Sequence, residues 1–137
     1  MAIPSFSVGE KLLASDAQEL SDAVTSFGDS TPGTAKTGFT VTLDSVLTFC
    51  DGKIVDLTLR VTNASAITAT SGNIPDTDIY VLNAAYRPVS FFPVPFSTGA
   101  VGGMAIIDSD GSVTLQTASD SIAASSSIQI HAMYALA

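Results

Sequence analysis

The sequence has no tryptophan, one cysteine, one histidine and only five Lys and Arg residues among 137. Thirteen Asp and Glu outnumber these five, and the formal net charge is −8, so no basic stripe is available to neutralise nucleic-acid phosphates. No apolar run approaches the roughly 18 residues of a membrane-spanning helix. Residues 1–9 lack the basic start and apolar core of a signal peptide. The sequence therefore predicts no nucleic-acid partner and no membrane insertion.

The single cysteine, Cys50, excludes an internal disulfide framework and cannot form a zinc cluster alone. We expect it to be a small, partly buried thiol. An unpaired thiol fits folding in a reducing compartment such as bacterial cytoplasm.

Charged residues make up only 13% of the chain and hydrophobic residues 46%, which excludes a disordered acidic tail. The length fits one domain with its own core. Ser and Thr number 33, and eleven Asp stand against two Glu, so strand and turn formers outweigh helix formers. A surface rich in hydroxyl groups and poor in charge suggests contact with neighbours in an assembly. The alternative is a β monomer with Thr-rich outer faces.

One helix is expected near the N-terminus. Ser15 and Gln18 form a capping box, and Gly28 supplies a stop signal. Between them the apolar residues recur at helical spacing and predict a helix over about residues 16–26: Leu20, Ala23, Val24 and Phe27. We therefore divide the chain into an N-terminal arm and helix (1–28) for docking or oligomerisation, a Gly- and Pro-containing linker (29–38) and a β domain (39–137).

Short alternating segments fill the β domain. The alternation places Phe39, Val41 and Leu43 on one strand face, and it is cleanest over residues 55–62. Prolines within 91–96 indicate an edge strand or an ordered loop. Further strands are expected at 79–82, at 128–134 and in a hairpin of 104–107 with 113–117. The pattern predicts a mainly β fold, an antiparallel β-sandwich or jelly-roll-like domain preceded by one short helix.

No motif for catalysis stands out. His131 has no nucleophile elbow or other supporting spacing, so we expect an ordinary strand histidine, no enzyme activity and no cofactor. Two carboxylate pairs, Asp76 with Asp78 and Asp108 with Asp110, raise the question of a cation site, but we expect a turn entering a strand at the first pair and a plain hairpin turn at the second. The sequon at Asn63 carries no weight without a signal peptide.

The N-terminal segment resembles the opening of many tailed-bacteriophage virion proteins. In those proteins a short arm of the pattern F-x-x-G-x-x-L-T-A-x-D leads into a helix. Phe6, Gly9, Leu12, Ala14 and Asp16 match the pattern, and Leu13 stands where Thr is common.

A second stretch, from Asp51 to about Leu115, resembles the β domain of phage tail-fibre, baseplate and other virion-surface proteins. There L-P-x-G-Y-R-P precedes a strand containing Pro and Phe. This chain keeps Tyr86-Arg87-Pro88, whereas Asn83 and Ala85 replace the first Pro and the Gly. For such domains the resemblance implies a homotrimer without catalytic residues.

The leading hypothesis is a non-enzymatic structural protein on the outside of a tailed-phage virion, made in the bacterial host cytoplasm. Its partners would be sister subunits and other virion proteins of the capsid or tail. The arm would dock to the particle while the β domain projects outward, as a capsid decoration or a tail appendage. The alternatives are a receptor- or carbohydrate-binding module, with a host-surface glycan as partner, and a small hydrolase. The candidate interface residues are Phe6, Leu12, Leu20, Val24, Phe27, Tyr86 and Arg87.

Overall fold

The computed structural model describes residues 28–29 and 31–136. The expected helix over 16–26 and five of the candidate interface residues, Phe6, Leu12, Leu20, Val24 and Phe27, lie outside the described residues. Within them the chain forms nine strands and one short 3-10 helix: β1 (Gly28–Asp29), β2 (Gly33–Ala35), β3 (Phe39–Phe49), β4 (Ile54–Asn63), β5 (Asn73–Leu82), η1 (Ala84–Tyr86), β6 (Phe92–Ser97), β7 (Gly102–Ile107), β8 (Ser112–Ala118) and β9 (Ser127–Ala135).

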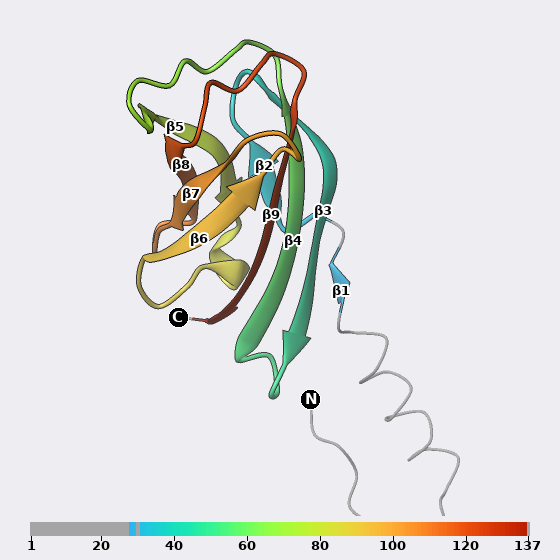
Figure 1. Cartoon of the computed structure of the whole chain (residues 1–137). Helices are drawn as coiled ribbons and strands as arrows, with labels where there is room; N and C mark the ends of the chain where they lie inside the picture. The colour runs from blue at the N-terminus through green and yellow to red at the C-terminus, as the bar shows by residue number, and fades with distance from the viewer. Residues whose placement is uncertain (1–27, 30, 137) are drawn as a thin grey trace, which may run out of the picture.

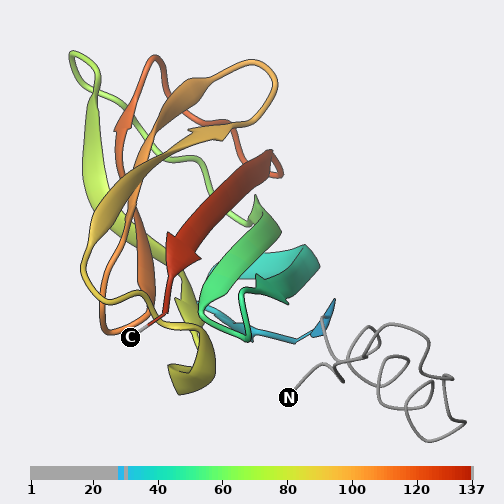
Figure 2. The same ribbon diagram turned by 90° about the horizontal axis from the view of Figure 1, so that it is seen from below.

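The strands form one antiparallel sheet in the order β1-β3-β4-β9-β6-β7-β8-β5-β2. Its two edges come from neighbouring parts of the chain, so the sheet rolls up and nearly closes into a barrel (Figures 1 and 2). Seen from below, β3, β4 and β9 curve along one side and β5 to β8 along the other. The expectation of a mainly β, antiparallel fold is confirmed.

Strict alternation on the central strands builds the core. β4 sends Val55, Leu57, Leu59 and Val61 inward, each no more than 1% exposed. β9 alternates in the same way, with buried residues at every second position from Ile128 to Tyr134. The strands expected at 55–62 and 128–134 and the hairpin of 104–107 with 113–117 are therefore confirmed.

A β-bulge in β3 overturns the expected position of Leu43. The register with β4 shifts between Val41, opposite Val61, and Leu43, opposite Arg60. Thr42 lies at the shift, and its hydroxyl donates a hydrogen bond to the Arg60 carbonyl (3.2 Å). Because one extra residue reverses the alternation beyond the bulge, Leu43 faces outward and is 41% exposed.

The same reversal places Asp44 where the two sheet edges approach each other. Tyr80 of β5 donates its hydroxyl hydrogen to Asp44 Oδ2 at 2.6 Å, linking β5 to β3 across the open seam. The Tyr80 side chain is fully buried. The segment 29–38, expected to be a linker, contributes to the same closure. β2 pairs with β5, and the Lys36 amide donates to the Ile79 carbonyl.

Prolines are tolerated in two strands for local reasons. β6 carries Pro93 and Pro95, which have no backbone N–H to donate. It pairs with β9 only at Phe96 and Ser97, so neither proline has to donate a hydrogen bond to β9. β5 begins at Asn73 and contains Pro75, so it is longer than the strand expected at 79–82. Its register with β8 is irregular from Asn73 to Thr77, which accommodates the missing amide.

The Asn63 side chain forms hydrogen bonds to the two loops at the upper end of the barrel, the one after β4 and the one before β9. This side chain is 1% exposed, donates to the Ser65 and Ala123 carbonyls (2.8 and 2.9 Å) and accepts from the Ser126 amide (2.9 Å). The sequon asparagine is therefore a buried structural group and not an accessible glycosylation site.

We predict that the bond across the seam contributes measurably to stability. Tyr80→Phe should lower the free energy of unfolding by about 1.5–3 kcal/mol, the range for a hydrogen bond to a charged group. Urea unfolding of Tyr80→Phe, Asp44→Ala and the double variant forms a thermodynamic cycle that separates this bond from other contacts of Tyr80. The double variant should lose less than the sum of the single variants. Strict additivity would contradict the assignment.

Candidate functional site

Tyr86-Arg87-Pro88 lies at the lower end of the barrel (Figure 1). The β3–β4 turn, residues 83–91 and the β7–β8 turn form this end. Tyr86 ends η1, is half-buried and packs against the core. Pro88 is buried and bridges to Leu136 beyond the end of β9. Val89 follows and donates its amide to the Ala135 carbonyl. This segment is therefore fastened to the end of β9.

Arg87 holds the end of β5 against the β7–β8 turn. Its Nε donates to the Leu82 carbonyl at 3.3 Å, and the Leu82 amide donates to the Gly111 carbonyl at 2.9 Å. Gly111 has φ +93°, and a Cβ there would lie 2.6 Å from the Leu82 carbonyl oxygen and 3.0 Å from Arg87 Nε. Only glycine fits this contact, so the three residues form one packed unit.

The Asp110 carboxylate completes this unit. Hydrogen bonds from Ser112 are the main cause that holds the pKa of Asp110 below its ordinary value of 3.8, and the charges of Arg87 and Lys36 add to the effect. The Ser112 amide lies 2.8 Å from Asp110 Oδ1. The Asp110 carboxylate is solvent-exposed and is stabilised in its charged form.

Tyr134 ties the same segment to the core. Its hydroxyl donates to the Tyr86 carbonyl at 2.6 Å, and its ring lies 5.4 Å from that of Phe92. Burial raises the pKa of the Tyr134 phenol, which therefore remains a neutral donor. The hydrogen bonds of Tyr86 and Arg87 described here are thus made within the chain.

Two large apolar side chains extend from this anchored segment. Val89 is 61% exposed and Phe91 is 64% exposed. Because residues 86–88 are fixed by the contacts above, Val89 and Phe91 are presented from a rigid base. Exposed apolar groups on a fixed base are typical of contact surfaces.

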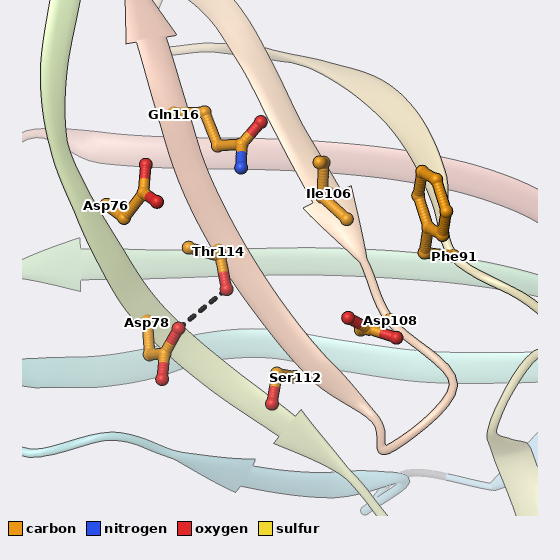
Figure 3. Close-up of a pocket in the computed structure, with 8 residues that line it drawn as sticks. All are labelled: Asp76, Asp78, Phe91, Ile106, Asp108, Ser112, Thr114 and Gln116. Atoms are coloured by element: carbon orange, nitrogen blue, oxygen red, sulfur yellow. Dashed lines mark hydrogen bonds between the residues drawn. The ribbon is translucent and has the colours of Figure 1, made fainter.

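Phe91 also borders a shallow groove of about 330 Å³ on the outer face of β5, β8 and β7, which we call the acidic groove (Figure 3). Asp78, Thr114 and Ile106 form one row across the three strands, and Thr114 Oγ1 donates to Asp78 Oδ1 at 2.6 Å. The lining combines three carboxylates, hydroxyls, an amide and an aromatic ring: Asp76, Asp78, Phe91, Ile106, Asp108, Ser112, Thr114 and Gln116.

The carboxylate pairs do not gather into a metal site. Asp108 accepts from Ser109, and Asp110 accepts from Ser112, so both shape the hairpin turn. Asp78 accepts from Thr114 on the neighbouring strand. Among residues 28–29 and 31–136, no group of three or more His, Cys, Asp or Glu side chains is placed to hold a metal ion.

A second surface lies on the outer face of β3, β4 and β9. Two cross-strand rows meet there: Leu47 with Asp56 and Met133, and Phe49 with Ile54 and Ala135. Directly opposed residues share a face of the sheet. Leu47, Phe49 and Met133 are 46%, 40% and 62% exposed. We call these two rows the apolar face.

His131 lies beside the apolar face. As expected, it is on the opposite side of β9 from the buried Ile130 and Ala132, and its side chain is 64% exposed. Its Nε2 is hydrogen-bonded to Asp56 Oδ1. The pair joins β9 to β4 on an open surface.

The expectation of a partly buried thiol is wrong, because Cys50 is exposed. It lies at the tip of the β3–β4 turn, where Cys50 and Asp51 have φ of 52° and 59°. A residue in the turn beyond the paired ends of β3 and β4 lies outside the sheet, where there is no core for its side chain to pack against.

No known protein family matches this chain, and no curated protein matches it. In the part of the chain that the structure describes, no helix has the length and apolar character needed to cross a membrane.

The acidic groove and the apolar face differ in how far their residues could be recognised from the sequence. The acidic groove was missed, since it joins residues from three strands and two connecting loops. For the apolar face, the signal that could have been used is the alternation over 128–134, which puts Met133 on the opposite side of the strand from the core positions.

We predict that Asp110 makes the stability of the barrel pH-dependent. A carboxyl group whose pKa is depressed in the folded state contributes stability above its ordinary pKa, here 3.8. This contribution is lost as the pH falls below 3.8 and through the folded-state pKa. Asp110→Asn should therefore lower the urea midpoint at pH 7, and the difference from the parent should shrink towards pH 2.

Asp120→Asn, which removes a charge from the loop at the upper end, is the charge-matched control. Equal differences between the parent and Asp110→Asn at pH 7 and pH 2 would contradict the assigned role of Asp110.

Proposed function

We propose that the chain is a non-enzymatic structural protein on the outside of a tailed-phage virion. In this proposal it forms a homotrimer, the N-terminal arm docks to the particle, and the β domain, sandwich-like and preceded by the short helix, projects outward as a capsid decoration or a tail appendage. The support from sequence is the virion-like arm at residues 6–16 together with Tyr86-Arg87-Pro88.

The observation that carries the proposal is that the described chain begins at the same end of the barrel as Tyr86-Arg87-Pro88. Gly28 pairs with Leu47, two residues before the end of β3, and Phe49 pairs with Ile54 next to Ala135. Val89 bonds to that same Ala135. The start of the described chain and the anchored 86–91 segment therefore lie at one end of the barrel, as a docking end requires.

The polar groups at this end also favour a structural role. Arg87 and Asp110 hold turns and strand ends together, and Tyr134 fixes Tyr86. Exposed Val89 and Phe91 offer apolar area to a neighbour. Burying each such side chain contributes about 1.5–3 kcal/mol to an interface. Docking through this end would leave the loops around Asn63 and Ser126 at the outer end.

Immunogold labelling of intact parent virions with an antibody to this chain tests the proposal. We expect gold either over the capsid shell, which assigns a decoration role, or at the tail, which assigns an appendage. Protein found only in the infected-cell lysate, with unlabelled particles, would overturn the proposal. Deleting residues 2–14 should abolish particle binding, and the deletion variant should keep the β-sheet circular dichroism of the parent. Retained binding would refute docking through the arm.

The acidic groove favours a second candidate, a receptor- or carbohydrate-binding module of a tail fibre or baseplate. A shallow hollow with an aromatic ring and a few polar groups is a common form of ligand site. The carboxylates of Asp76, Asp78 and Asp108 can accept hydrogen bonds from hydroxyl groups, and their charge disfavours anionic sugars. This candidate therefore requires a neutral or amino-bearing saccharide.

A glycan array probed with the labelled full chain tests this candidate. It predicts binding to neutral or amino sugars that Phe91→Ala weakens at least about tenfold, since a stacked aromatic ring contributes on the order of 1.5 kcal/mol. Val89→Ala is the matched control, because Val89 is similarly exposed on the same segment but does not line the groove. No binding to any saccharide, or equal loss in both variants, would contradict it.

A further inference from the structure

The apolar face needs a covering partner. It joins three exposed large side chains, Leu47, Phe49 and Met133, to Ile54 and Ala135 in two adjacent rows. Its one charged residue, Asp56, lies between Leu47 and Met133 and is hydrogen-bonded to His131. The inward faces of the same strands already form the core, so these outward groups contribute nothing to it. Contiguous exposed apolar groups of this kind mark a surface that contacts another element.

The described chain begins at the border of this face. β1 is antiparallel to β3, with Gly28 opposite Leu47 and Asp29 opposite Val46. Going backwards from Gly28, the chain runs in the direction of Phe49 and the β3–β4 turn. The 27 residues that precede Gly28 are therefore attached directly beside the apolar face.

The sequence of that segment complements the face. Leu20, Ala23, Val24 and Phe27 form the apolar stripe of the helix predicted over 16–26, and its remaining residues are mostly polar. A helix of this length is marginal in water on its own, so it needs an apolar surface to pack against. Glycine at position 28 allows the chain to reverse at the helix end.

The length of the predicted helix matches the distance from β1 to β9 across the apolar face. Eleven helical residues extend about 16 Å. The distance from β1 across β3 and β4 to β9 is three strand spacings, about 14 Å. With Gly28 on β1, a helix along the rows carries Val24 about 6 Å and Leu20 about 12 Å from β1. Val24 then lies over β3, near Leu47, and Leu20 lies between β4 and β9, near Met133.

We infer that residues 16–27 dock as an amphipathic helix on the apolar face of the same chain, with Leu20, Val24 and Phe27 packed against Met133, Ile54, Leu47 and Phe49. Direct attachment at Gly28 gives the chain's own helix a far higher effective concentration than a second copy's helix. Residues 2–14 remain available for docking. The inference does not depend on where the protein acts, so it stands or fails separately from the proposed virion role.

Thiol crosslinking of the full-length chain tests this inference. In a Cys50→Ser background, the Leu20→Cys/Met133→Cys variant should form an intramolecular disulfide under mild oxidation, detected as a faster-migrating monomer on a non-reducing gel. The matched control is Leu20→Cys/Gln129→Cys. Gln129 is exposed on the outer face of β9 four residues away, about 13 Å along the strand. The control should crosslink much more slowly.

Other outcomes overturn the inference. Disulfide-linked dimers would show that a second copy covers the face, and equal rates in both variants, or no disulfide in either, would show that the helix is not seated there. Thiol labelling of Met133→Cys in the Cys50→Ser background gives an independent measurement. Labelling should be at least about tenfold slower than in a variant that also carries Leu20→Asp and Val24→Asp, because docking occludes the site. Equal labelling rates would likewise overturn the inference.

Discussion

The hydrogen bond from Tyr80 to Asp44 is the contact on which the closed form of this sheet depends. The bond spans the seam between the sheet edges, and it exists because the bulge at Thr42 turns Asp44 towards the seam and Leu43 away from it. A buried phenol without an acceptor costs free energy, so Tyr80 and the bulge require each other. A one-residue irregularity in β3 thus determines which face of the strand is apolar on either side of it.

The reversal also explains why the barrel has an apolar outer face. Beyond the bulge, every second residue of β3 from Leu43 to Phe49 faces outward, whereas Asp44 and Val46 face inward. The outer face of β5, β8 and β7 is instead lined by carboxylates and hydroxyls. The two sides of the molecule therefore suit different neighbours. The side of β3, β4 and β9 suits an apolar neighbour, and the side of β5, β8 and β7 suits one rich in hydroxyl groups.

Much of the fold could be predicted from the sequence, because alternation reports local burial. Residues 55–61 and 128–134 alternate without interruption, and both strands lie where expected. Leu43 could not be placed, since a bulge leaves no mark in the hydrophobic pattern. Strand 73–82 was underestimated because Pro75 suggests a turn, and the exposure of Cys50 follows from a turn conformation that alternation does not encode. The acidic groove depends on strand order, and no local pattern specifies strand order.

Tyr86-Arg87-Pro88 illustrates how a recognisable motif can be architectural. The sequence made Arg87 a candidate interface residue, and the structure gives its Nε a carbonyl acceptor of its own chain. That contact requires Gly111 in the facing turn. Leu82 and Gly111, 29 positions apart in the sequence, are therefore held in one packed contact. The motif therefore has a role within the fold that needs no partner. In the proposed function, the groups that contact a partner are Val89, Phe91 and the groove beside them, which the anchored motif positions.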